Sequence, residues 1–221
     1  TTPWTIPFNL AIMVNPKLDY VKADVEGETW IVGKGLVGPL VTSIAGKKLN
    51  IFDEFKGKTL EGLEYTHPWE KEIPKFAKLK KKHKNVHTVL LSEEYVDFTA
   101  GSGLVHCAPG CGPEDQEVGK SYHIPPFNAL NEGGFFQEEA GELFVGKRAK
   151  VDDKFFIEEL KKTGSLIAST KVEHEYPHCW RCHNPVIFRT TKQWFFKIED
   201  LKKAMTKENS KVNWVPKTQA F

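Results

Sequence analysis

The sequence predicts an α+β fold: a β-barrel-like body of short strands with a few peripheral helices. Three observations lead to this prediction. Short apolar runs rich in Val and Ile alternate with glycine turns, which favours a closed or partly closed barrel. The 221 residues are 40% hydrophobic and 27% charged, enough to bury one large core. One amphipathic stretch, residues 151–162, has the period of a helix.

The first half of the chain is expected to be mostly β. Residues 9–14 are apolar and strand-like, and residues 20–25 and 29–32 predict a hairpin around the turn at 26–28. The glycine-rich stretch 33–46 suits a short helix or a turn. Further short strands are expected at 48–52, 62–65, 86–91 and 95–99.

A lysine-rich segment interrupts these strands at residues 70–84, EKEIPKFAKLKKKHK. Clustered lysines can neutralise the phosphates of an RNA backbone. Such runs are more often the solvated face of a loop or helix. We therefore expect a solvated face here, with RNA contact as the alternative.

The second half contains the clearest helix, at residues 151–162. Asp152 can cap its start, Phe156, Ile157 and Leu160 share one face, and Gly164 stands where a C-terminal cap belongs. Its apolar stripe is expected to face the core. Strands are expected at 165–171 and 186–189, and a second short helix at 198–205.

Composition excludes some function classes. Lys and Arg number 31 against 29 Asp and Glu, a formal charge of +2, so no global basic field points to nucleic acid and any RNA contact must be local. No apolar run approaches the roughly 20 residues of a membrane span, so we expect no membrane partner and a cytoplasmic protein. The chain starts inside a motif without Met, as expected for a domain of something larger.

The stretch at residues 101–119, GSGLVHCAPGCGPEDQEVG, offers a titratable pair. A Gly-Ser-Gly turn and a short apolar strand deliver His106, and a Gly/Pro loop then opens a helix near Pro113 that carries Asp115. Gly101 and Gly103 permit positive φ and close approach of a ligand. Such a carboxylate could hold a small cationic group. The plainer alternative is that Asp115 caps a helix and His106 is a satisfied core histidine.

Three motifs in order carry a resemblance to a known family. They are TTPWT at residues 1–5, G-S-G-L-V-H-x-A-P-G followed by an Asp nine residues after the His, and YPHCWRC at 176–182. Together they resemble the editing domain of class I isoleucyl-tRNA synthetases over nearly the whole chain. The resemblance implies an editing domain at 1–176. It also implies a C-x2-C knuckle and return segment, at 177–221, toward a catalytic domain outside this chain.

The resemblance implies an aminoacyl-tRNA deacylase. A pocket built for isoleucine cannot exclude valine, which is one methylene smaller, a limit for which isoleucyl-tRNA synthetases are the standard illustration. A second, hydrolytic site removes the error. The implied substrate is valine esterified to the tRNA for isoleucine, with valyl-adenylate as a possible second substrate. The implied partners are that tRNA, valine and the rest of the synthetase in cis.

Residue roles follow from the same resemblance. Asp115 is expected to bind the α-ammonium of the aminoacyl group, and His106 to line the amino-acid pocket and set its size. Thr1, Thr2 and Thr5 are expected to surround the ester and the attacking water. Substrate contacts are also expected from Trp4, Gly101 and Gly103. No covalent nucleophile is needed.

One position bears on which amino acid is edited. Relatives specific for valine usually carry Lys where His106 stands, and those specific for leucine usually carry Met, so His106 points to isoleucine. Cys107 and Cys111 depart from the family, in which Thr and His are common at these positions.

The cysteines raise the question of zinc. Cys179 and Cys182 form the C-x2-C turn that lets two thiolates reach one tetrahedral Zn²⁺. The family completes this knuckle with a second pair that precedes the editing insertion, so the resemblance implies a half-site here and zinc in the full-length protein. Editing itself is expected to need no cofactor. A four-Cys site with Cys107 and Cys111, or two free thiols, are the alternatives.

Other functions stay open from the sequence. The chain could be a non-catalytic zinc-knuckle RNA-binding module, although residues 78–84 lack the stacking aromatics such a module uses. It could also be a hydrolase of another small ester, or the editing domain of a valyl- or leucyl-tRNA synthetase.

Overall fold

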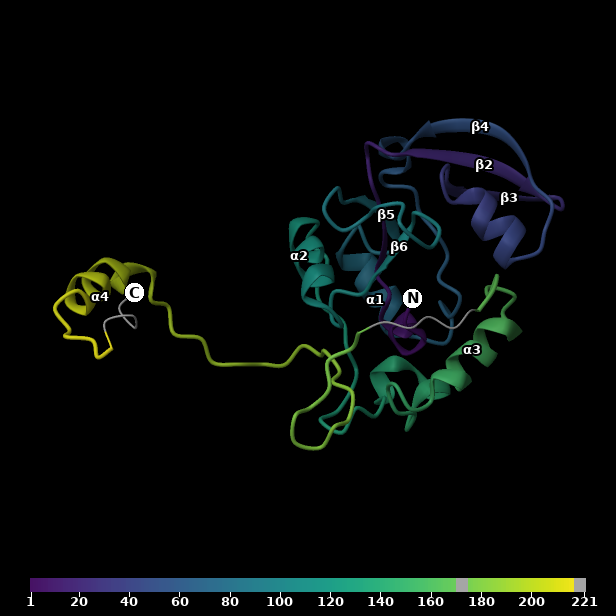
Figure 1. Ribbon diagram of the computed structural model, residues 1–221. Coiled ribbons are helices and arrows are strands. Elements are labelled where there is room, and N and C mark those ends of the chain that lie inside the picture. The colour runs from purple at the N-terminus through teal and green to yellow at the C-terminus, as the bar shows by residue number, and fades with distance from the viewer. Residues whose placement is uncertain (170–174, 217–221) are drawn as a thin grey trace. The chain divides into compact units, whose positions relative to one another are not determined.

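The structure is a computed structural model that describes residues 1–169 and 175–216. The chain divides into two compact units, Thr1–Thr190 and Thr191–Phe221. The predicted functional division at 176/177 is a separate question and stays a prediction. The α+β class is confirmed: two small three-stranded sheets and several short helices make up the first unit (Figure 1).

The first sheet has three strands in the order β5-β1-β6. Its central strand β1 (Ala11–Val14) pairs in parallel with β5 (Thr88–Leu91) and antiparallel with β6 (Val105–Cys107). The predicted strands at 9–14 and 86–91 are therefore confirmed, and the strand leading to His106 is β6. Because β1 is buried on both faces, it reads as a continuous apolar run, AIMV.

The second sheet has the order β3-β2-β4 and contains the predicted hairpin. β2 (Asp19–Val25) and β3 (Glu28–Gly33) are joined by Glu26 and Gly27, which both have positive φ (54° and 93°). Two such residues make the turn whose twist matches paired strands. The third strand, β4 (Asn50–Lys56), begins and ends later than the expected strand at 48–52.

The two sheets share a small core cluster instead of closing into a barrel. Its buried members come from β1, β2, β5 and the 3-10 helix η3 (Gly57–Leu60): Val14, Tyr20, Val89 and Leu60. No hydrogen-bond ladder joins the sheets among the described residues, so the barrel stays open. The main core lies on the other side of β1, where residues 1–13 meet the helices.

Phe98 explains why residues 95–99 are not a strand. This segment is an irregular loop, and the Phe98 ring contacts the Tyr20 ring edge-on at 5.4 Å. A Cβ added at Gly33 or Gly103 would lie 2.6 Å from the same ring. The loop therefore delivers one aromatic side chain into the space between the sheets, and two glycines make room for it.

The described residues contain four α-helices: α1 (Lys75–Lys82), α2 (Pro113–Ser121) and α3 (Asp153–Lys162) in the first unit, and α4 (Lys202–Asn209) in the second. In α1, Phe76 and Leu79 are buried while Lys78, Lys81 and Lys82 are exposed, so the lysine run is a solvated helix face as expected. Short 3-10 turns and one π-helical segment join them: η1 (Pro3–Phe8), η4 (Glu138–Ala140), η5 (Glu142–Phe144), η6 (Glu199–Leu201) and η2 (Gly38–Ile44).

The predicted helix at 151–162 is confirmed as α3, with Phe156 and Leu160 buried. Asp152 does not cap it by a side-chain bond, because its carboxylate accepts the Arg148 N–H at 2.7 Å. Gly164 follows the C-cap with φ of 73°, as expected. The second short helix, expected at 198–205, corresponds to η6 and α4.

Three further predicted strands are wrong. Residues 62–65 make one isolated bridge, Glu64 to Thr88, and residues 186–189 form no strand. Residues 165–169 are irregular, and the rest of that predicted strand lies outside the described residues. Within the described part of the chain, residues 165–169 and 186–189 lack a partner strand, which a strand needs for its hydrogen bonds. Residues 62–65 do exchange backbone hydrogen bonds with residues 87–89, but the pairing amounts to a single bridge. No helix in the described part is long and apolar enough to cross a membrane.

Candidate functional site

The pairing of β1 with β6 assembles the site. Ile12 lies opposite His106 in this pair, and just before β1 the Leu10 N–H donates to the Cys107 carbonyl at 3.0 Å. The threonine-rich N-terminal segment η1 runs directly into β1. Two motifs about a hundred residues apart are therefore brought side by side.

His106 bonds to both of its neighbours from the N-terminal segment. Its Nε2 lies 3.1 Å from Thr5 Oγ1, and its Nδ1 lies 2.8 Å from Asn9 Nδ2. The Asn9 amide also donates to the Ala11 carbonyl at 2.8 Å, which identifies Nδ2 as the donor. His106 Nδ1 is then the acceptor, and the ring carries its proton on Nε2, where it donates to Thr5. Thr5 in turn donates to the Thr2 carbonyl at 2.8 Å.

Asn9 is a site residue that sequence reasoning missed. It is buried, and its Oδ1 accepts a short hydrogen bond from the Tyr65 hydroxyl. Desolvation raises the pKa of that Tyr65 hydroxyl, so it stays a donor. A signal was available: an Asn directly before a buried apolar strand must find hydrogen bonds in the core.

The His106 ring is held neutral. Desolvation by burial lowers the pKa of His106 to about 3. The hydrogen bonds also favour the neutral ring. Protonation of Nδ1 would place two donors, the ring N–H and the Asn9 amide, against each other. The imidazole is thus uncharged and held in one orientation, and its Nε2–H donates to Thr5.

Asp115 stands in the first turn of α2, as predicted. Its Oδ1 accepts the Ala108 N–H at 3.1 Å, and its Oδ2 is so close to Gly112 that a Cβ there would collide with it. The carboxylate also accepts a hydrogen bond from its own backbone N–H in the first turn, so a capping role and the predicted ligand role stay alternatives. Desolvation raises the pKa of Asp115 above its usual range. A cationic partner would stabilise the charged form in such a place.

A cavity of about 270 Å³ opens beside these residues, near the lower end of the ~300–1,000 Å³ typical of ligand pockets. Its walls come from η1, from the start of α2, and from the segment around the C-x2-C turn: Thr2, Trp4, Thr5, Cys111, Gly112, Pro113, Glu114, Tyr176 and Phe188. Thr2, Trp4 and Thr5 are therefore placed together as predicted residues of one pocket.

Other predicted site residues lie beside this cavity or away from it. His106 does not line the cavity but is bonded to Thr5, which does. Asp115 likewise does not line it but lies against Gly112, which does. Thr1 is exposed and does not line it. Gly101 (φ 81°) has open space around its Cα, whereas Gly103 (φ 78°) is packed against Phe98. The role visible for Gly103 is therefore packing.

The C-x2-C segment, Cys179 to Cys182, is a tight turn. The His183 N–H donates to the Cys179 carbonyl at 2.8 Å, which closes the turn. Backbone N–H groups of Cys182 and Arg181 lower the pKa of the Cys179 thiol. Burial instead raises the pKa of the Cys107 and Cys111 thiols. In the described part of the chain, no three His, Cys, Asp or Glu side chains gather as a ligand set, so both zinc hypotheses stay predictions.

Comparison with known proteins connects this geometry to a family. Residues 19–220 match the family described as tRNA synthetases class I (I, L, M and V). The chain is 44% identical to an isoleucine–tRNA ligase of Pyrococcus furiosus over 221 residues, 98% of this chain and 20% of that protein. It is 41% identical to an isoleucine–tRNA ligase of Aquifex pyrophilus, over 98% of this chain and 42% of that protein.

The chain spans about 20% of the length of its Pyrococcus relatives, the one from Pyrococcus horikoshii included, at 43% identity. The solved structure of GlLeuRS-CP1 has the same fold, with a TM-score of 0.56 at 14% sequence identity. That likeness covers 77% of this chain and 81% of the solved one.

Proposed function

The chain belongs to the class I tRNA synthetases (I, L, M and V), and from that premise we propose that it is an editing domain that hydrolyses mischarged aminoacyl-tRNA. The proposed substrate is valine esterified to the tRNA for isoleucine. One observation supports this most: β1–β6 pairing places His106 against Thr5 of the TTPWT segment, and that segment and the loop before Asp115 line one small cavity. The isoleucine-specific relatives support the choice of tRNA.

The proposed chemistry is attack of water on the ester carbonyl. Asp115 holds the α-ammonium of the aminoacyl group by a charge-assisted hydrogen bond, and this fixes the ester relative to the threonines. The Thr2 and Thr5 hydroxyl and backbone groups orient water and the carbonyl oxygen. The neutral His106 cannot act as a cation there, so its proposed role is steric: it limits the side chain that the pocket admits.

Tyr176 and Phe188 add an aromatic wall to the cavity, which suits the terminal adenosine of a tRNA. The remaining partners and locations stay proposals: the rest of the synthetase in cis, zinc at Cys179 and Cys182 in the longer protein, and the cytoplasm.

A deacylation assay tests the proposal. The 221-residue chain, at high concentration, is incubated with valyl-tRNA and isoleucyl-tRNA for isoleucine, and with a plain valyl ester. We expect hydrolysis of the valyl-tRNA, far slower hydrolysis of the isoleucyl-tRNA, and little of the plain ester. Unchanged valyl-tRNA with folded protein would contradict the proposal. Equal rates on the plain ester would instead indicate a small-ester hydrolase.

A further inference from the structure

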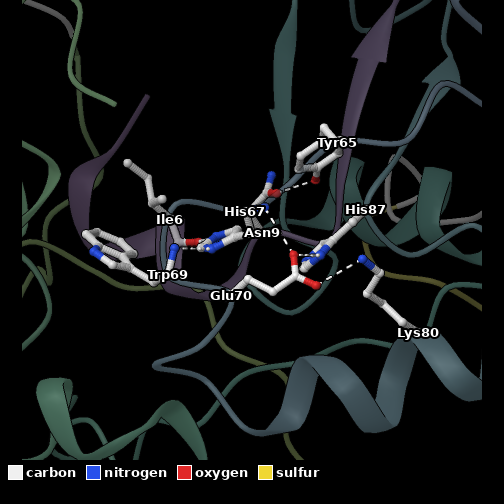
Figure 2. Close-up of polar contacts among 8 residues, drawn as sticks. All are labelled: Ile6, Asn9, Tyr65, His67, Trp69, Glu70, Lys80 and His87. Atoms are coloured by element: carbon white, nitrogen blue, oxygen red, sulfur yellow. Dashed lines mark hydrogen bonds and ion pairs between the residues drawn. The ribbon is translucent and has the colours of Figure 1, made fainter. Parts of the chain in front are cut away.

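A polar cluster of His67, Glu70, Lys80 and His87 contacts η1 at Ile6 (Figure 2). Its nearest member to η1 is His67, which is 2% exposed. His67 Nε2 lies 2.9 Å from the Ile6 carbonyl oxygen, and its Nδ1 accepts the Trp69 N–H at 3.0 Å. These two contacts place the ring proton on Nε2, so His67 is a donor to Ile6.

Glu70, His87 and Phe76 also contact His67. Glu70 Oε2 accepts the His67 backbone N–H at 3.3 Å, and Glu70 Oε1 accepts from Lys80 Nζ at 2.9 Å (Figure 2). The His87 ring stacks on His67 with centroids 5.4 Å apart and planes at 19°, and the Phe76 ring meets both edge-on. His87 Nδ1 lies 3.5 Å from Glu70 Oε2. The His87 and Phe76 rings therefore restrict the orientation of the His67 ring, while Glu70 holds the His67 backbone.

The segment that His67 holds is also anchored by the buried Trp4 and Phe8 side chains, by the Thr5–His106 bond and by the Trp4 backbone N–H at Asp153, but its backbone makes few other hydrogen bonds to neighbouring elements. Pro3 and Pro7 lack a backbone N–H, so neither can donate to a neighbouring element. Within the segment, the Thr5 N–H bonds to the Thr2 carbonyl and the Asn9 N–H to the Ile6 carbonyl. A bond from His67 to Ile6 therefore ties the residue next to Thr5 to a different part of the chain.

We propose that His67 is a positioning residue for hydrolysis at this site: its Nε2–H holds the Ile6 carbonyl and thereby sets where Thr2 and Thr5 stand at the cavity. The inference rests on the proposed deacylase function. His67 does not line the cavity itself, so it acts through the N-terminal segment. A displacement of about 1 Å in groups that orient a reactant can lower the rate about 100-fold.

Two amide variants separate the two ring nitrogens. In His67→Gln the side-chain amide reaches about as far as Nε2, so the donor to Ile6 is kept while the acceptor for Trp69 is lost. In His67→Asn the shorter amide keeps the acceptor near Nδ1 and loses the donor to Ile6. Both variants remove the ring from the core, so both are expected to lower the melting temperature similarly. His123→Asn is the matched control, because His123 is exposed with φ of 59°, which Asn tolerates.

The measurement is kcat and KM for hydrolysis of valyl-tRNA, with the melting temperature of each variant. We expect His67→Asn to lose at least tenfold in kcat with KM changed less than threefold. His67→Gln and His123→Asn should stay within threefold of the unaltered chain. Equal losses in the Gln and Asn variants, or no loss in either, would overturn the positioning role.

A second measurement keeps the inference testable if the unaltered chain hydrolyses nothing, an outcome that refutes the proposed function alone. The backbone N–H of Asn9 donates to the Ile6 carbonyl, so its hydrogen exchange rate reports directly on the held segment. Exchange should be at least tenfold faster in His67→Asn than in His67→Gln. Equal exchange in the two variants would refute the tie between His67 and Ile6.

Discussion

Asp115 shows how one side chain serves both the local structure and the proposed chemistry. It stands in the first turn of α2, and its carboxylate accepts both the Ala108 N–H from the preceding loop and its own backbone N–H. Desolvation raises the pKa of this group, which means that the charged form lacks full compensation within the protein. An ammonium group from a ligand would supply that compensation.

Asp115→Asn separates charge from shape. The amide keeps an acceptor for Ala108, so the fold and melting temperature should change little. Loss of one charge-assisted bond, worth about 1.5–3 kcal/mol, should lower hydrolysis of valyl-tRNA about 10- to 100-fold. Asp115→Ala should lose the same activity and some stability as well. Full activity in the Asn variant would show that the carboxylate only positions the loop.

His106→Ala tests exclusion against catalysis. The pocket gains the volume of an imidazole, so isoleucyl-tRNA, which is normally spared, should be hydrolysed at least tenfold faster. Hydrolysis of valyl-tRNA should persist. Deacylation of both substrates is measured side by side, with folding verified by circular dichroism. Should the variant lose valyl activity and gain none toward isoleucyl-tRNA, His106 takes part in the chemistry and the steric role is wrong.

At the scale of elements, the loop before β6 is shaped by its contact with the neighbouring sheet. Phe98 enters the space between the sheets, and the Tyr20 hydroxyl donates to the Gly103 carbonyl at 2.7 Å. Gly103 therefore needs both a positive φ and an absent side chain. This contact determines where β6 begins and thus where His106 stands on it.

Two alanine substitutions separate these requirements. Gly101→Ala meets only the backbone penalty of a positive φ, about 1–2 kcal/mol. Gly103→Ala adds a collision with Phe98, for which overpacking costs about 1–3 kcal/mol more. Chemical denaturation should therefore show the larger loss of unfolding free energy at Gly103. Equal losses at both positions would mean that the Phe98 loop moves aside freely.

At the scale of the whole molecule, burial favours the neutral form of three histidines, His67, His87 and His106. Desolvation lowers the pKa of His67 to about 4 and that of His106 to about 3, and it lowers the pKa of His87 too. Because their unfolded pKa values lie near 6.5, the unfolded chain takes up protons first as the pH falls. The stability that they contribute is fully present above about pH 6.5.

The free energy of unfolding should fall between about pH 6.5 and pH 4. For His67 the shift corresponds to about 3 kcal/mol over that interval. The raised pKa of Asp115 acts in the opposite direction at the acidic end, because the folded state then takes up that proton first. Denaturation at several pH values measures the profile, and His67→Gln should flatten it. A profile that is level from pH 7 to 5 would contradict the neutral buried histidines.

Local elements were predictable because their causes are local. The Glu26-Gly27 turn fixes the hairpin, Pro113 starts α2 with Asp115 in its first turn, and the stripe of Phe156 and Leu160 defines α3. The motif residues that resemble the synthetase family were legible in the same way, since a motif is a pattern of nearby residues. What the sequence by itself determined is therefore the local conformation and the identity of the family.

Only the tertiary structure decided which distant segments meet. The pairing of β1 with β6 and the bonds of Asn9 to His106 and of His67 to Ile6 join residues far apart in the chain. The same dependence explains the failed strands, such as 95–99, where an apolar run delivers one side chain to the core instead of pairing. Long-range contacts depend on the packing of every element between them, and no short pattern of residues encodes that packing.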